Sequence, residues 1–191
     1  MAYSLQEILK KFCIEVDIQP YGDGHINDTY LAQSTPKYIL QRINTDVFKR
    51  PDQVMENIAS VTKHLKEKII QEGGNPLRET LTVVKTESGE NYLQDEEGCY
   101  RVYRFIEGAR TYNLPESPEQ MYQAAKAIGK FQKRLADFPA DQLHETIPQF
   151  HDTPNRVEQL KQAISQNRAG KLDTCQPEVE FALEMSRYAS L

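Results

Sequence analysis

One ordered series of elements constrains the fold of this chain more than any other feature. A loop containing Gly22 and Gly24 separates two apolar segments, and residues 38–43 then alternate as a strand that carries Arg42. A long amphipathic helix follows, beginning near Pro51. Glycine permits the sharp reversal that the loop needs, and both its exposed N–H groups and a nearby arginine can bind phosphate. The series therefore predicts a small antiparallel sheet covered by a helix, with a loop suited to phosphate.

Composition and charge argue against several classes of protein. The chain has 191 residues and a formal net charge of -5, whereas surfaces that bind nucleic acid concentrate Lys and Arg. Cys13, Cys99 and Cys175 are far apart and lack the spacing of a disulfide framework or a zinc site. No basic start and apolar run marks a secretion signal, and no segment approaches the ~20 apolar residues that span a bilayer. We expect a cytoplasmic protein without nucleic-acid or membrane partners.

Local signals predict the elements of the first part of the chain. Ser4 and Glu7 form a capping box before a short opening helix. A helix beginning at Pro51 repeats apolar residues at helical spacing until Gly73 and Gly74 end it. Alternation and turn residues predict strands at residues 16–18, 30–32, 38–43, 81–84, 92–93 and 99–106.

Beyond Gly108 the pattern changes from strand to helix. Three apolar stripes at helical spacing lie within residues 121–135, 157–164 and 179–189. The predicted fold class is therefore α+β. We expect a boundary near Gly108 between a small lobe of antiparallel sheet and long helix, residues 1–107, and a helical part, residues 108–191.

Arg42 has two interpretations. Alternation with period two puts it on one face of its strand and Gln41 on the other. Arg42 is either an edge-strand side chain that extends to water or a planar fork that holds phosphate oxygens. On the helix after Pro51, Glu56 projects nearly opposite the apolar stripe and reads as a solvated carboxylate. Asn57, on the flank of the stripe, is better placed to support Arg42, with a local packing hydrogen bond as the alternative.

Residues 150–155 place a histidine beside an aspartate. The pair is adjacent in sequence and leads into a helix, for which we predict Thr153 as the N-cap and Pro154 as the first helical residue. His64 and His144 lack carboxylate partners at catalytic spacing. The strand end at residues 103–108 passes from sheet to helices, where a cleft would expose backbone groups to a purine; an ordinary linker is the alternative.

Several blocks in this order resemble the aminoglycoside phosphotransferase family of small-molecule kinases, and within it the N-acetylhexosamine 1-kinase group. The blocks are residues 24–30, 38–44, 54–58, 105–108 and 150–152. The resemblance implies a protein-kinase-like fold, ATP with Mg²⁺, and transfer to a sugar hydroxyl, the anomeric one of an N-acetylhexosamine. It assigns nucleotide binding to Gly22, Gly24, His25, Ile26, Asn27, Arg42, Glu56, Asn57, Phe105, Ile106 and Glu107.

The resemblance also implies that part of the enzyme lies outside these residues. The family's catalytic base and metal-binding aspartates sit on a catalytic loop and a following strand that would come after Leu191. We therefore assign no catalytic or metal-binding residue, and expect the chain alone to be inactive and its C-terminal helices to self-associate through uncovered apolar faces. The alternatives are a noncatalytic module that binds a nucleotide or a partner protein, and a relative of homoserine or choline kinases.

Overall fold

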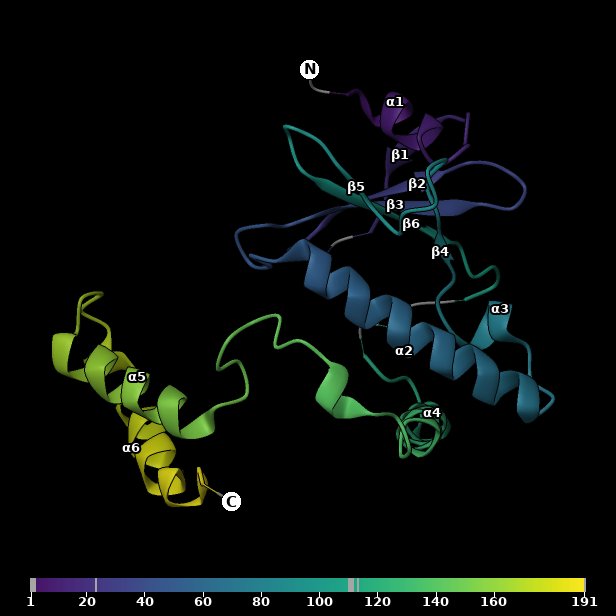
Figure 1. Ribbon diagram of the computed structural model, residues 1–191. Coiled ribbons are helices and arrows are strands. Elements are labelled where there is room, and N and C mark those ends of the chain that lie inside the picture. The colour runs from purple at the N-terminus through teal and green to yellow at the C-terminus, as the bar shows by residue number, and fades with distance from the viewer. Residues whose placement is uncertain (1–2, 23, 110–111, 113, 191) are drawn as a thin grey trace. The chain divides into compact units, whose positions relative to one another are not determined.

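The computed structural model describes residues 3–22, 24–109, 112 and 114–190, and the chain packs as two compact units. Met1–Thr146 form the first, and Ile147–Leu191 form the second. The first unit holds a sheet and its covering helices (Figure 1). The division into lobes at residues 107 and 108 stays a prediction, because compact packing does not mark where a nucleotide-binding lobe ends.

Within the described ranges, six antiparallel strands form one sheet. They are β1 (Ile18–Pro20), β2 (Asp28–Ala32), β3 (Tyr38–Ile43), β4 (Val83–Val84), β5 (Leu93–Gln94) and β6 (Cys99–Arg104). Their order is β1-β2-β3-β6-β4, and β5 also pairs with β6. Each predicted strand is present, although several ends differ, and β3 and β6 lie side by side at the centre. The α+β fold class is confirmed.

Two helices of the first unit, α1 and α2, begin at the predicted signals. They are α1 (Leu5–Lys10), α2 (Pro51–Gln71), α3 (Pro76–Glu79), α4 (Pro118–Arg134) and the 3-10 turn η1 (Ala140–Gln142). The capping box is confirmed, since Ser4 N–H donates to Glu7 Oε2 at 2.7 Å and Ser4 Oγ accepts from Glu7 N–H at 3.3 Å. Pro51 is the first residue of α2, where its missing N–H has no intrahelical partner to lose.

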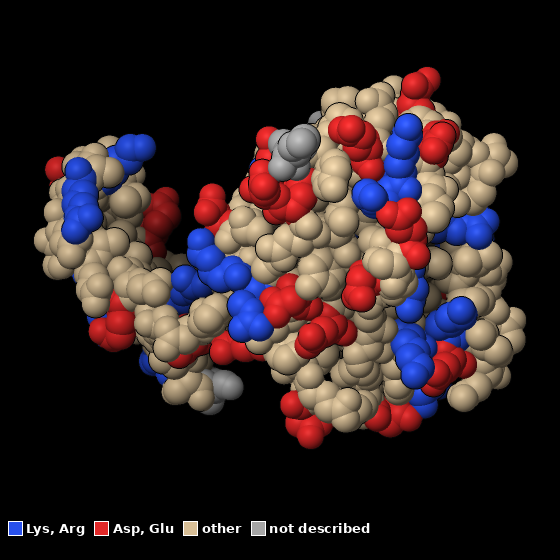
Figure 2. All heavy atoms as spheres, turned by 45° about the horizontal axis from the view of Figure 1, so that its top comes forward, with Lys and Arg blue, Asp and Glu red and all other residues tan. Residues whose placement is uncertain are grey.

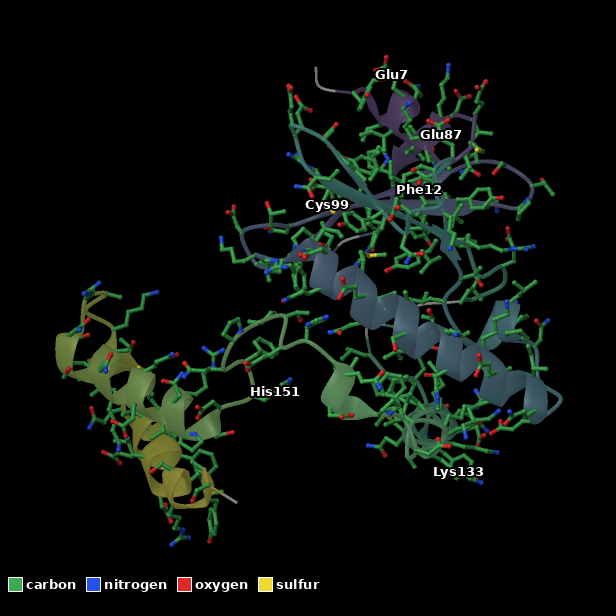
Figure 3. All side chains as sticks on the ribbon, viewed as in Figure 1. Glu7, Phe12, Glu87, Cys99, Lys133 and His151 are labelled. Atoms are coloured by element: carbon green, nitrogen blue, oxygen red, sulfur yellow. The ribbon has the colours of Figure 1, made fainter. Side chains whose placement is uncertain are left out.

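The second unit contains α5 (Thr153–Gln166), η2 (Leu172–Thr174), α6 (Gln176–Met185) and η3 (Ser186–Tyr188). The N-cap of α5 is Asp152, whose side chain accepts from Asn155 N–H at 2.9 Å, so the prediction of Thr153 is wrong by one residue. A carboxylate caps as well as a hydroxyl, and proline is tolerated throughout the first turn. His151, labelled in Figure 3, precedes this cap and packs its ring edge-on against Phe150.

Two helices cover opposite faces of the sheet (Figure 1). On the α1 side the buried core consists of Ile8, Leu9, Phe12, Ile14, Ala32, Leu40, Tyr100 and Val102. On the α2 side a smaller core joins Ile43 and Cys99 to Met55 of α2. Phe12 and Cys99, labelled in Figure 3, belong to these two cores. Alternate residues of β3 and β6 thus face different helices.

A nearly buried arginine fastens α4 to the C-terminal end of α2 and to α3. Arg134 is 6% exposed, and its Nη2 lies 2.7 Å from both Glu72 Oε2 and Glu79 Oε2. Lys130 adds a contact of 3.0 Å to Glu79. These hydrogen bonds to Arg134 and Lys130 lower the pKa of the Glu79 carboxyl to about 2. The network compensates the cost of burying the guanidinium.

The segment after α4 returns to α2 at His144. Asn57 Nδ2 donates to the His144 carbonyl and Asn57 Oδ1 accepts from its N–H, both at 2.9 Å. Glu56 Oε2 lies 2.6 Å from His144 Nε2, so this histidine has a carboxylate partner from a distant part of the sequence. Asn57 therefore satisfies both backbone groups of a residue that belongs to no helix or strand.

The surface of the first unit keeps an apolar stripe on α4. Met121, Ile128 and Phe131 are 55%, 60% and 49% exposed. Charged side chains of both signs are interspersed over the face in Figure 2. Among the helices that the structure describes, none is long and apolar enough to cross a membrane.

The ion-pair network makes stability depend on pH in the acidic range. The pKa of Glu79 in the folded state is lowered from its ordinary 4.5 to about 2. The stability that the ionised carboxylate adds to the folded state is therefore complete above pH 4.5 and is lost as pH falls toward 2. We expect Glu79→Gln to lower the urea midpoint at pH 7 and to lose less further stability than the wild type between pH 5 and pH 3. Glu87→Gln, which removes only an exposed contact with Lys11, is the matched control. Parallel curves for wild type and Glu79→Gln would contradict this account.

The hydrogen bonds to His144 predict a second effect on stability. Asn57→Ala leaves two half-buried backbone groups without their partner, and we expect a loss of about 1–3 kcal/mol in urea denaturation. Amide exchange at His144 should become faster. Glu56→Gln changes only an exposed side-chain contact and should cost less than about 0.5 kcal/mol. Unchanged exchange at His144 in Asn57→Ala would show that the contact does not hold this segment.

Candidate functional site

The glycine loop joins β1 to β2 and is closed by one backbone hydrogen bond. Tyr21 N–H donates to Thr29 O at 2.9 Å, and Gly22 adopts a φ of +79°, which other residues rarely take. A Cβ added at Gly22 or Gly24 would meet nothing within 4 Å, so the backbone there is open to solvent. Asp23 lies outside the described residues. Such a loop leaves room for an anion to approach.

The rest of the loop divides into an exposed tip and an anchored end. His25 and Ile26 are exposed. Asn27 Oδ1 accepts from Asn44 N–H at 3.0 Å and so fastens the loop to the end of β3. The predicted loop residues therefore lie beside β3, as the order of elements in the sequence implied.

Arg42 lies on the α1 side of the sheet, as its alternation with buried Leu40 requires. Its guanidinium donates to the Glu97 carbonyl, and Nη1 lies 4.0 Å from Asp28 Oδ2. A Cβ at Gly98 would lie 2.8 Å from Arg42 Nε, so glycine is needed beside it. Arg42 shares a polar pocket of about 220 Å³ with three acidic residues, Asp28, Asp46 and Glu97.

The α2 side of the same strands carries a different polar cluster, which sequence reasoning missed. Gln41 on β3 lies opposite Arg101 on β6. Gln41 Oε1 accepts from Arg101 Nε at 3.1 Å and from Nη2 at 3.0 Å, and Gln41 Nε2 donates to Thr29 Oγ1 at 3.1 Å. Arg101 Nη1 lies 4.0 Å from Met55 Sδ of α2, which places the guanidinium on that side. The one sequence signal for this cluster was the alternation of β3, which places Gln41 on the other face of the strand from Arg42.

The predicted adenine segment contacts the glycine loop. The rings of Tyr21 and Phe105 meet edge to face with centroids 5.9 Å apart. Phe105 N–H donates to Lys37 O at 2.9 Å, and the Glu107 carbonyl accepts from Arg78. Within the described residues, no backbone partner is recorded for the N–H or carbonyl of Ile106. Among those residues the Phe105 carbonyl and the Glu107 N–H have no backbone partner either, so the segment keeps two donors and two acceptors.

Neither Glu56 nor Asn57 supports Arg42 in this structure, because both side chains contact His144 instead. The structure therefore favours the alternative in which Asn57 makes a packing hydrogen bond. Whether either residue also acts in nucleotide binding stays a prediction.

Burial shapes the chemistry of the central strand. It raises the pKa of the Cys99 thiol to about 12 and raises the pKa of Tyr103, so both stay protonated at neutral pH. Arg101 stacks on Tyr103, with Cζ 5.2 Å from the ring centroid. The α2 side of β6 thus presents a cation against neutral, apolar neighbours, which suits it to hold an anion rather than to carry out nucleophilic chemistry.

Comparisons with known proteins agree with this architecture. Residues 17–189 match the family described as Phosphotransferase enzyme family (APH). Among solved structures, the chain is similar to the spectinomycin phosphotransferase APH(9)-Ia in complex with ADP and spectinomycin. The TM-score is 0.53 and the identity 15%, over 96% of this chain and 57% of that one.

A second similar structure is an aminoglycoside phosphotransferase from Alicyclobacillus acidocaldarius, with a TM-score of 0.55 and 17% identity. It is matched over 98% of this chain and 53% of its own. The chain therefore spans little more than half the length of these structures, and at such identities they show the fold alone. The family match extends over nearly the whole sequence, and the chain belongs to the phosphotransferase enzyme family.

Proposed function

We propose that this chain is the nucleotide-binding part of an ATP-dependent kinase that acts on small molecules. Kinases of this kind transfer a phosphoryl group chiefly by positioning it and stabilising its charge. The contact between Tyr21 and Phe105 carries the proposal, because it joins the glycine loop to the segment expected to hold adenine. The similar structure that contains ADP supports a nucleotide in this fold.

In this proposal the purine lies against residues 105–107. The Phe105 N–H and the Glu107 carbonyl already have partners in Lys37 and Arg78. Ile106 is the residue of the three whose N–H and carbonyl both lack a backbone partner among the described residues, so we assign it to donate to and accept from the base. Leu31 and Ile39, paired across β2 and β3 on the α2 side, supply apolar surface for the ring. The phosphates would extend along the open backbone of Gly22 and Gly24 toward His25, Ile26 and Asn27.

The metal and the catalytic base are assigned elsewhere. The described residues contain no group of three His, Cys, Asp or Glu side chains placed to hold a metal ion. When bound, Mg²⁺ neutralises charge on the phosphates of ATP. Because the resemblance assigns no metal ligand and no catalytic base to these residues, we propose that this chain binds nucleotide without transferring the phosphoryl group.

For the acceptor we propose an N-acetylhexosamine, phosphorylated at its anomeric hydroxyl. The proposal rests on the sequence blocks shared with that group of kinases, and one similar structure contains a small-molecule acceptor, spectinomycin. Homoserine kinases and choline kinases share the same order of loop, strand and helix, so homoserine and choline are the competing acceptors. Self-association through exposed apolar faces of the helices in residues 108–191 and a cytoplasmic location stay predictions.

Calorimetric titration tests the nucleotide site directly. We expect the purified chain to bind ATP with Mg²⁺ and ADP saturably, and not inosine triphosphate with equal affinity, because the Ile106 backbone is matched to adenine. No detectable binding of ATP or ADP by a chain with a folded circular dichroism spectrum would refute the proposal.

A steady-state assay tests the second half of the proposal. The chain alone should show no ATP-dependent phosphorylation of N-acetylhexosamine, homoserine or choline above a control without protein. A longer chain that continues past Leu191 should phosphorylate the N-acetylhexosamine preferentially. Preference for homoserine or choline would be consistent with the proposed kinase activity but would contradict the proposed acceptor.

A further inference from the structure

We propose that Arg101, and not Arg42, is the cation that holds the nucleotide phosphates. The inference rests on the proposed nucleotide site and names a residue within it. Arg42 was the sequence candidate because it lies on β3, directly after the glycine loop. The structure provides three separate reasons to transfer this role to the neighbouring central strand.

The first reason is the face on which each guanidinium lies. The contact between Tyr21 and Phe105 and the pair Leu31–Ile39 define the face on which a nucleotide would be sandwiched. Gln41 follows Ile39 at period two, and Arg101 lies opposite Gln41. Arg42 projects from the other face, which α1 covers. Arg42 therefore lies on the opposite face of the sheet from Leu31 and Ile39.

The second reason is a continuous chain of hydrogen bonds from Arg101 to the glycine loop. Arg101 donates to Gln41, and Gln41 donates to Thr29 at 3.1 Å. Thr29 in turn donates through Oγ1 to the Asn27 carbonyl at 3.4 Å. Arg101, Gln41 and Thr29 lie on successive strands, β6, β3 and β2, and Asn27 is the last loop residue before β2. The contacts that orient the guanidinium therefore also hold the end of the loop.

The third reason is the charge around each arginine. Arg101 forms no ion pair with any carboxylate in the part of the chain that the structure describes, and its oxygen acceptor is the neutral amide of Gln41. A half-buried cation without a counterion favours an anionic ligand. Arg42, by contrast, lies in a pocket with Asp28, Asp46 and Glu97, whose carboxylates repel phosphate.

Gln41 then acts as a positioning residue. Its amide fixes two of the guanidinium nitrogens by hydrogen bonds at 3.1 Å and 3.0 Å while leaving the full positive charge available. A carboxylate at the same place would neutralise that charge. Arg101 Nη1, which faces Met55 Sδ at 4.0 Å, is the nitrogen with no oxygen acceptor among the described residues.

Calorimetry with a ligand series separates a phosphate contact from a structural role. ATP with Mg²⁺, ADP and adenosine are titrated into the wild type and into Arg101→Met, Arg101→Lys, Arg42→Met and Arg104→Met. Removing a charge-assisted hydrogen bond predicts a loss of roughly 10- to 100-fold in affinity for ATP and ADP in Arg101→Met. Adenosine affinity should stay within about twofold, and Arg101→Lys should recover part of the loss because it keeps the charge.

Arg104→Met is the matched control, because Arg104 lies on the same strand but faces the α1 side opposite Tyr38. It should bind all three ligands as the wild type does, and Arg42→Met should lose less ATP affinity than Arg101→Met. Wild-type ATP affinity in Arg101→Met, or a larger loss in Arg42→Met, overturns the inference while leaving the nucleotide site intact. Absence of ATP binding by the wild type overturns the proposed function and this inference together.

A measurement on the wild type tests the contact without comparing the affinities of variants. The Nε–H resonance of Arg101, assigned by its absence from the spectrum of Arg101→Lys, should shift when ADP is added and stay in place with adenosine. The resonance of Arg104 should not move with either ligand. A shift of the Arg42 resonance without one at Arg101 would contradict the inference.

Discussion

The register between β3 and β6 is the constraint on which the rest of the first unit depends. It pairs Leu40 with Val102, both fully buried on the α1 side, and so forces Gln41 and Arg101 onto the α2 side. A slip of one residue would exchange the faces, driving the guanidinium of Arg101 into the apolar core under α1. The cost of burying that charge without a partner, added to the loss of the core, excludes the slipped pairing. Packing on one face therefore determines the polar chemistry of the other.

The same register explains why two arginines close together in space have different surroundings. Arg42 pairs with Tyr100 at the end of the ladder, where the β5–β6 turn supplies the Glu97 carbonyl and β2 supplies Asp28. The guanidinium of Arg42 thus already has partners within the protein. The Arg42 side chain also fills the space beside Gly98. Arg101 lies deeper along the ladder, against Met55 and Tyr103, and receives only a neutral amide.

Sequence reasoning succeeded where the deciding interactions are local. The capping box of α1, the start of α2 at Pro51 and the alternation of β3 all depend on residues within a few positions of one another. It could not anticipate the carboxylate partner of His144, because Glu56 lies far away in the chain and only the docking of the segment after α4 brings them together. Arg101 was missed for the same reason: alternation assigns faces within one strand, but only pairing tells which faces of two strands coincide. At α5 the error was of another kind, since Asp152 and Thr153 are both good caps and the choice between them is a small energy difference.

Placing the phosphate-binding cation on β6 would change how it is controlled. A cation on the strand next to the glycine loop can be held by a carboxylate from the covering helix. That carboxylate then partly neutralises its charge. Here Glu56 of α2 is turned to His144, and the guanidinium is held instead by Gln41, which is tied through Thr29 to the end of the loop. Because the holding group is neutral, no charge has to be released before an anion binds. Because the tether runs through β2 and β3, movement of the loop and reorientation of the cation are coupled through this chain of side-chain hydrogen bonds instead of through the position of the helix.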